Sequence, residues 1–129
     1  MTSKRIVVID DSKLVLAVAA EALENAGYEV FATDSGIDAN RYIYSSRRPD
    51  LILIDVMMPL LSGDRKVRLL KEREASRDIP VVLMSTKPRE ELSEIARAVG
   101  ADGVIPKPFT EQSLLRQIRV FLDAERGAA

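Results

Sequence analysis

Five short runs of mostly apolar residues recur along the chain, and longer segments with helical spacing separate them. The apolar runs lie at residues 5–9, 29–33, 51–54, 81–84 and 103–105. The helical segments are expected at residues 14–26, 36–46, 64–74, 89–99 and 110–125. Strands that alternate with helices of this length are typical of βαβ units in a parallel sheet. The run at 51–54 is apolar on both faces, so we expect an α/β fold with helices on both sides of a doubly wound sheet.

Two of the expected helices carry an apolar face that we expect to pack on this sheet. In the first, the apolar residues at helical spacing are Leu14, Ala17, Val18, Leu23 and Ala26. In the last, they are Leu114, Leu115, Ile118, Phe121 and Leu122. Gly27 is expected to end the first helix.

Length and composition limit the possible functions. The chain has 129 residues, a formal net charge of −1, no Cys and no His. This length suits one domain over residues 1–129, with a short C-terminal tail at 123–129. The even charge balance argues against a nucleic-acid-binding surface over the whole domain. The absence of Cys and His excludes disulfides, thiolate or imidazole metal ligands, and Ser-His catalysis.

The N-terminal segment does not have the pattern of a signal peptide. Only four apolar residues precede the acidic pair at 10–11. Every apolar run is far shorter than the roughly 20 residues that a membrane helix needs. We therefore expect a cytoplasmic protein without membrane association.

At the edge where functional residues gather in open parallel sheets, only Thr33 and Asp34 follow the second expected strand, but candidate site residues follow the other four. They are Asp10 and Asp11 after the first strand, Asp55 after the third, Ser85 and Thr86 after the fourth, and Lys107 after the fifth. No comparable cluster follows the second strand. The coincidence of three acids, hydroxyls and a lysine at one edge favours a common site.

Each of these residues also has a purely local interpretation. Asp10, Asp11 or Ser12 could cap the helix that follows them, because Asp and Ser are favoured N-caps. Ser85 or Thr86 could likewise cap the helix that starts near residue 88. An isolated Asp55 would simply begin a loop, and an isolated Lys107 would be a solvated surface residue.

Three neighbouring carboxylates require compensation. At ~4 Å and an effective dielectric near 20, each pair of like charges costs about 4 kcal/mol. Lys107 or a divalent cation could supply the positive charge, and Mg²⁺ suits oxygen ligands and phosphate. A carboxylate can also attack phosphorus and form an aspartyl phosphate, a transfer that depends on positioning and on neutralising phosphoryl oxygens.

The sequence resembles the response-regulator receiver domain of two-component signalling over about residues 4–122. The matching segments are "VVIDDS" at 7–12, "PDLILIDVMMP" at 49–59, Gly63, "IPVVLMST" at 79–86 and "GADGVIPKPF" at 100–109. The resemblance implies a flavodoxin-like (βα)5 fold with strand order 2-1-3-4-5.

The resemblance also implies a role for each residue of the site. Asp55 would be the phosphoacceptor. Asp10 and Asp11 would hold Mg²⁺ together with Asp55 and the main-chain carbonyl of Met57. Lys107 would bind the phosphoryl group. No organic cofactor is implied.

Three further features of the site follow from the same resemblance. Ser85 would be the switch hydroxyl; Thr86 is an alternative, but the spacing to Lys107 favours Ser85. The backbone N–H of Thr86 would contact the phosphoryl group. The bond between Lys107 and Pro108 is expected to be cis.

The sequence departs from the usual receiver pattern at several positions. Val104 stands where the family has a switch aromatic, which puts relay by that side chain in doubt. Met57 and Lys87 occupy positions that influence dephosphorylation, and we expect the apolar Met57 to limit the access of water. Gly103 stands where winged-helix transcription regulators usually carry an acid.

The leading hypothesis is a phosphoacceptor switch that is not an enzyme beyond its own phosphorylation and dephosphorylation. A sensor histidine kinase or a phosphotransfer protein would phosphorylate Asp55. The signal would reach an effector protein through the face built from the fourth helix, fifth strand and fifth helix. We expect no direct contact with nucleic acid, and a monomer or a weak phosphorylation-dependent dimer.

Two alternatives belong to other classes. A pseudo-receiver would act as an interaction module without phosphorylation, which the loss of the switch aromatic favours. An aspartate-nucleophile phosphatase would need a second Asp two residues after the first, where this chain has Ser12.

Overall fold

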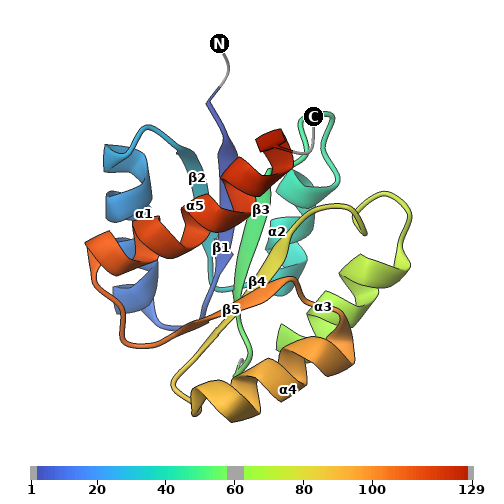
Figure 1. Ribbon diagram of the computed structural model, residues 1–129. Coiled ribbons are helices and arrows are strands. Elements are labelled where there is room, and N and C mark those ends of the chain that lie inside the picture. Colours follow the sequence, from blue (N-terminus) through green and yellow to red (C-terminus); the bar gives the residue numbers. More distant parts are fainter. Residues whose placement is uncertain (1–2, 58–62, 128–129) are drawn as a thin grey trace.

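The computed structural model describes residues 3–57 and 63–127 (Figure 1). The strands are β1 Arg5–Ile9, β2 Glu29–Thr33, β3 Leu51–Asp55, β4 Val81–Ser85 and β5 Gly103–Pro106. The helices are α1 Lys13–Asn25, α2 Gly36–Ile43, α3 Gly63–Glu72, α4 Arg89–Val99 and α5 Glu111–Gly127. The strands form one parallel sheet of order β2-β1-β3-β4-β5, which confirms the flavodoxin-like fold.

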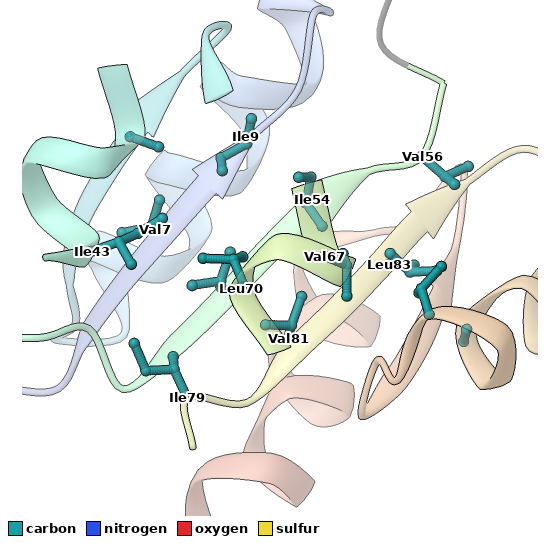
Figure 2. Close-up of a cluster of buried hydrophobic side chains, with 14 of the residues drawn as sticks. Val7, Ile9, Ile43, Ile54, Val56, Val67, Leu70, Ile79, Val81 and Leu83 are labelled. Atoms are coloured by element: carbon teal, nitrogen blue, oxygen red, sulfur yellow. The ribbon is translucent and has the colours of Figure 1, made fainter. Parts of the chain in front are cut away.

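Two apolar cores lie on opposite faces of the sheet. On one face, α2, α3 and α4 cover a cluster that includes Ile52, Ile54 and Leu83. Figure 2 shows this cluster, with Val67 and Leu70 of α3 lying over the strands. On the other face, α1 and α5 cover a second cluster. Because side chains alternate along a strand, β3 supplies both cores, and all five of its residues are buried. It therefore holds Asp55 on a rigid central strand.

The apolar face of α5 packs as expected, but the face expected for α1 is only partly correct. Leu23 is buried, whereas Leu14 is 74% exposed and Ala17 and Ala26 are also exposed. The buried positions of α1 are Ala19, Ala22 and Leu23. Leu14 precedes Leu23 by nine residues, which places it about 180° around the helix at 3.6 residues per turn, so it faces away from the sheet.

The bounds of several elements differ from those expected. The strands β3 and β4 include Asp55 and Ser85, because their backbones continue the parallel ladder. Helix α2 ends at Ile43 instead of residue 46, where the hydroxyl of Ser45 donates to the carbonyl of Tyr42 and satisfies it outside the helix. Helix α5 continues to Gly127, two residues beyond its expected end at 125, so the segment expected as a tail is largely helical.

Within residues 3–57 and 63–127, no helix combines the length and apolar character that are needed to cross a membrane.

Candidate functional site

The carboxyl ends of β1, β3 and β5 bring three carboxylates and a lysine together. Oxygens of Asp10, Asp11 and Asp55 all lie within 4.8 Å of one another. Asp10 and Asp55 are buried, with 0% and 4% of their surface exposed, whereas Asp11 is exposed. The convergence expected at the carboxyl edge of the sheet is therefore present.

The residue that caps α1 is Ser12, and neither acid caps this helix. Ser12 Oγ accepts a hydrogen bond from the backbone N–H of Val15 at 3.2 Å. Asp10 Oδ1 accepts one from the backbone N–H of Ser12 at 2.9 Å. Asp10 therefore shapes the loop with one oxygen and presents the other to the site, while Asp11 is left available.

A hydrogen bond to its side chain and a close contact with its main chain fix the position of Asp55. Its Oδ1 accepts a hydrogen bond from the backbone N–H of Met57 at 3.1 Å. Gly63 at the start of α3 packs on the main chain of Asp55, where an added Cβ would lie 2.0 Å from the Asp55 carbonyl oxygen. Only glycine allows this approach, which explains why Gly63 accompanies the acidic residue in the sequence pattern.

Lys107 supplies the positive charge within the site. Its Nζ lies 2.6 Å from Asp10 Oδ2 and 3.7 Å from Asp55 Oδ1. Its backbone N–H donates to the carbonyl of Ser85 at 2.8 Å, and its bond to Pro108 is cis, as expected. The side chain is only 11% exposed, so Lys107 is buried against the acidic residues and is not a solvated surface residue.

The surroundings of Asp55 raise its pKa above the ordinary value of 3.8. Burial is the largest cause, because removing a carboxylate from water disfavours its charge. The Met57 N–H opposes burial, Asp10 adds repulsion, and Lys107 attracts the carboxylate. One lysine therefore compensates the acidic cluster incompletely, and the site still favours additional positive charge.

The donor set fits a small oxygen-binding cation. All three candidate ligands are carboxylates, which are the ligands that Mg²⁺ prefers. Asp10 Oδ2 is buried and has no well-oriented hydrogen bond among the described residues, although Lys107 Nζ is close. Such a polar atom is expected to find a partner in the folded protein. An ion held by Asp10, Asp11 and Asp55 would provide one.

Ser85 and Thr86 differ in burial. Ser85 is buried at the end of β4, and its Oγ accepts a hydrogen bond from the backbone N–H of Lys87 at 3.0 Å. Thr86 is exposed. Neither caps α4, whose N-cap residue is Pro88 without a side-chain hydrogen bond. The local alternative for these two residues is therefore wrong.

Val104 and Gly103, the two residues of β5 that differ from the usual receiver pattern, have different surroundings. Val104 is half-buried against the core formed with α2, α3 and α4. Gly103 lies under the ring of Phe121 on α5, where an added Cβ would be 2.2 Å from Phe121 Cζ. Phe121 thus occupies the space that a side chain at position 103 would need.

Three exposed apolar residues lie at the rim of the site, and of these only Met57 was recognised from the sequence. Leu14, Ile37 and Met57 are 74%, 73% and 57% exposed. They follow the carboxyl ends of β1, β2 and β3, which are adjacent strands in the sheet. The available signal was an apolar residue at the second position of α1 and of α2, outside the turns that pack on the core.

Comparisons with known proteins agree with this architecture. A family model described as the response regulator receiver domain matches residues 6–119. The chain is 37% identical over 122 residues to the phosphate regulon transcriptional regulatory protein PhoB of Pseudomonas aeruginosa, covering 95% of this chain and 53% of PhoB. It is 34% identical to Protein PilG of the same organism, covering 89% of this chain and 84% of PilG.

Solved structures show the same fold. The chemotaxis response regulator CheY4 of Vibrio cholerae is 29% identical and superimposes with a TM-score of 0.85, covering 94% of this chain and 100% of that one. The chain therefore spans the whole of CheY4, most of PilG and about half of PhoB.

Proposed function

The chain belongs to the receiver-domain family of response regulators, and from this premise we propose that it is a phosphorylation switch whose acceptor is Asp55. The observation that carries the proposal is the grouping of Asp10, Asp11 and Asp55 within 4.8 Å, beside Lys107. We propose that residues 1–129 act as one signalling unit. As a receiver domain, the chain is a signalling module and not an enzyme with an external substrate.

The transfer starts with attack of the Asp55 carboxylate on the phosphorus of a donor. A new O–P bond forms as the bond from phosphorus to the donor breaks, and the donor leaves with the electron pair of that bond. Oδ1 of Asp55 is occupied by the Met57 N–H, and no described residue donates to Oδ2, so Oδ2 is our candidate for the attacking oxygen. Hydrolysis later returns the carboxylate and releases inorganic phosphate.

Charge neutralisation is the main contribution of the surrounding residues. Lys107 lies between Asp10 and Asp55 and would pair with a phosphoryl oxygen once Asp55 is modified. Asp10, Asp11 and the Met57 carbonyl would hold Mg²⁺, which supplies additional positive charge to the phosphoryl oxygens. The backbone N–H of Thr86 and the hydroxyl of Ser85 would contact the same group.

The apolar rim supports a protein as the phosphodonor, such as a sensor histidine kinase or a phosphotransfer protein. A groove of about 270 Å³ adjoins Lys107 and Thr86, and its apolar walls are Leu14, Val15, Val18, Pro108 and Phe109. Exposed apolar surface beside a charged centre is characteristic of a docking surface. A donor seated there would bring its phosphoryl group to the acids.

The output would use the face of α4, β5 and α5, through contacts with an effector protein. The new charge on Asp55 would draw the Ser85 hydroxyl away from its bond with the Lys87 N–H. The loop between β4 and α4 would then shift. With Val104 in place of an aromatic, this loop movement would carry the signal without a rotamer exchange of a large side chain.

The test of the proposed function is phosphorylation by acetyl phosphate, followed by the intact mass. We expect a gain of one phosphoryl group with Mg²⁺, little gain with EDTA, and none in Asp55→Asn. Equal labelling of the wild type and Asp55→Asn would contradict Asp55 as the acceptor.

The alternative function is an interaction module that does not need phosphorylation, and Val104 is the observation that favours it. Under this alternative, neither acetyl phosphate nor any sensor kinase labels the chain. Circular dichroism of the same sample separates this outcome from misfolding.

A further inference from the structure

A basic hollow lies at the edge of the sheet opposite the acidic site. It has a volume of about 340 Å³ and is lined by Arg5, Arg41, Tyr42, Ser45, Ser46 and Arg47. Arg5 is the first residue of β1, while the remaining residues belong to the C-terminal end of α2 and the loop after it. This edge holds the amino ends of the strands, so the hollow is separate from Asp55.

Among the described residues, the three arginines have one acidic partner, Glu29, which lines the neighbouring hollow. Glu29 Oε2 lies 3.6 Å from Arg5 Nε and 3.0 Å from Arg47 Nη2. Arg5 Nη1 also donates to the carbonyl of Arg47. Arg41 forms no ion pair with the part of the chain that the structure describes. Glu29 therefore orders two of the guanidinium groups and leaves a local excess of positive charge in a chain whose net charge is −1.

The helix dipole accounts for the position of only one of the three arginines in the basic hollow. Arg41 lies in the last turn of α2, where a cation complements the helix dipole. Arg5 lies on a strand and Arg47 in a loop, so the dipole of α2 does not require either of them.

An aromatic hollow joins the basic one. It has a volume of about 160 Å³, shares Arg5 and Tyr42 with the basic hollow, and is also lined by Glu29, Val30, Phe31 and Pro49. The Glu29 carboxylate is paired with Arg5 and Arg47. The rings of Phe31 and Tyr42 are stacked, with centroids 3.5 Å apart and an interplanar angle of 21°. Charge and aromatic surface therefore lie side by side.

We infer that these joined hollows bind a small phosphorylated ligand with a planar ring, of the nucleoside monophosphate class. Guanidinium groups bind phosphate through paired, charge-assisted hydrogen bonds, and the Ser46 hydroxyl adds a polar group. The ring lies against Tyr42 and Phe31. The size of the basic hollow is that of a small-molecule site, and the net negative charge of the chain disfavours a polyanion spread over its surface.

The test is a calorimetric titration of the unphosphorylated chain with GMP and with AMP at constant ionic strength. Guanosine, inorganic phosphate and a short single-stranded RNA are titrated in parallel. We expect saturable binding of at least one mononucleotide, at least tenfold tighter than that of guanosine or inorganic phosphate. Arg41→Gln and Arg47→Gln are each expected to weaken binding about tenfold, because each removes a guanidinium group that donates charged hydrogen bonds to the phosphate.

Arg97→Gln is the matched control, because Arg97 lies in the last turn of α4 as Arg41 does in α2. Its affinity for GMP and AMP should equal that of the wild type. The inference is overturned if neither mononucleotide binds at about 1 mM, the concentration that corresponds to about −4 kcal/mol of binding free energy. It is also overturned if Arg41→Gln and Arg97→Gln behave alike, or if the RNA binds as well as the mononucleotide. The proposed role of Asp55 is unaffected by any of these results.

Discussion

Asp55 holds a negative charge at a position where only 4% of its surface reaches water. Its carboxylate must remain ionised in order to attack phosphorus, yet burial opposes that ionisation. The Met57 N–H and Lys107 relieve the conflict only in part, and Asp10 increases it. At the residue scale, the site is therefore built for function at the expense of stability.

This conflict predicts how stability depends on pH. Because the folded-state pKa of Asp55 is raised, the folded protein holds this proton more tightly than the unfolded chain does. The contribution of Asp55 to the free energy of unfolding is fully present below the pKa of Asp55 in the unfolded chain. It is lost as the pH rises through the pKa of Asp55 in the folded protein. Asp55→Asn lacks this loss, so its stability relative to the wild type should increase as the pH rises above the ordinary carboxyl pKa of 3.8 and through the raised folded-state pKa of Asp55.

Urea unfolding in EDTA at several pH values measures the difference in free energy of unfolding between Asp55→Asn and the wild type. Mg²⁺ should reduce this difference at neutral pH by stabilising the wild type more than the variant. An advantage of Asp55→Asn that is constant with pH would contradict the raised pKa as its origin.

Met57 should control the lifetime of the phosphorylated state. Its side chain is 57% exposed beside Asp55, and its N–H holds Asp55 Oδ1. Met57→Asn replaces an apolar side chain by one that can orient water, so we expect hydrolysis of the aspartyl phosphate to be several times faster. The decay of the phosphorylated mass gives the rate. A half-life in Met57→Asn equal to or longer than that of the wild type would refute this role.

At the scale of the elements, two glycines determine how helices approach the sheet. Gly63 lies against the backbone of Asp55, whereas Gly103 lies under the side chain of Phe121. A backbone cannot move without displacing β3, while a ring at a half-buried position can turn away. The two positions therefore form a matched pair for substitution.

Gly63→Ala should destabilise the protein by about 1–3 kcal/mol, as in an overpacked core, and should also reduce labelling of Asp55. Gly103→Ala should cost about 1 kcal/mol, the scale of a side chain forced off its rotamer, and should leave labelling unchanged. Chemical denaturation and labelling by acetyl phosphate test both variants. Equal labelling of the two would show that Gly63 does not position Asp55.

The same scale shows what the sequence could and could not predict. The strands were predictable because short runs rich in Val and Ile alternate with helical segments, and the central strands β3 and β4 are buried on both faces. The convergence of Asp10, Asp55 and Lys107 followed from the common edge of parallel strands. The surface position of Leu14 was missed, because the apolar residues of α1 were assigned to one face although Leu14 lies about 180° around the helix from Leu23. The basic hollow was also missed, because its arginines come from distant parts of the chain.

At the scale of the whole molecule, the two ends of the sheet differ in character. The carboxyl edge carries the acidic site and an exposed apolar rim, and the amino edge carries the arginines of the basic hollow. Phosphotransfer is therefore expected to depend on surface residues at the carboxyl edge that are not needed for the chemistry.

Leu14 provides a test of this dependence. We consider a sensor kinase that phosphorylates the wild type. Leu14→Asp should reduce phosphoryl transfer from this kinase about tenfold, because a charge would interrupt the apolar groove. Labelling by acetyl phosphate should remain unchanged. Val120→Asp on α5, also at an exposed apolar position, is the matched control and should leave both reactions unaffected. Equal transfer to both variants would place donor docking elsewhere.

The central claim is that one particular carboxylate accepts the phosphoryl group. Borohydride reduces an aspartyl phosphate to the corresponding alcohol and so marks the modified residue permanently. After phosphorylation with Mg²⁺ and reduction, peptide mass spectrometry should find the mark on Asp55 and not on Asp10 or Asp11. A mark on Asp10 or Asp11, or no mark in a sample whose intact mass shows phosphorylation, would contradict the account.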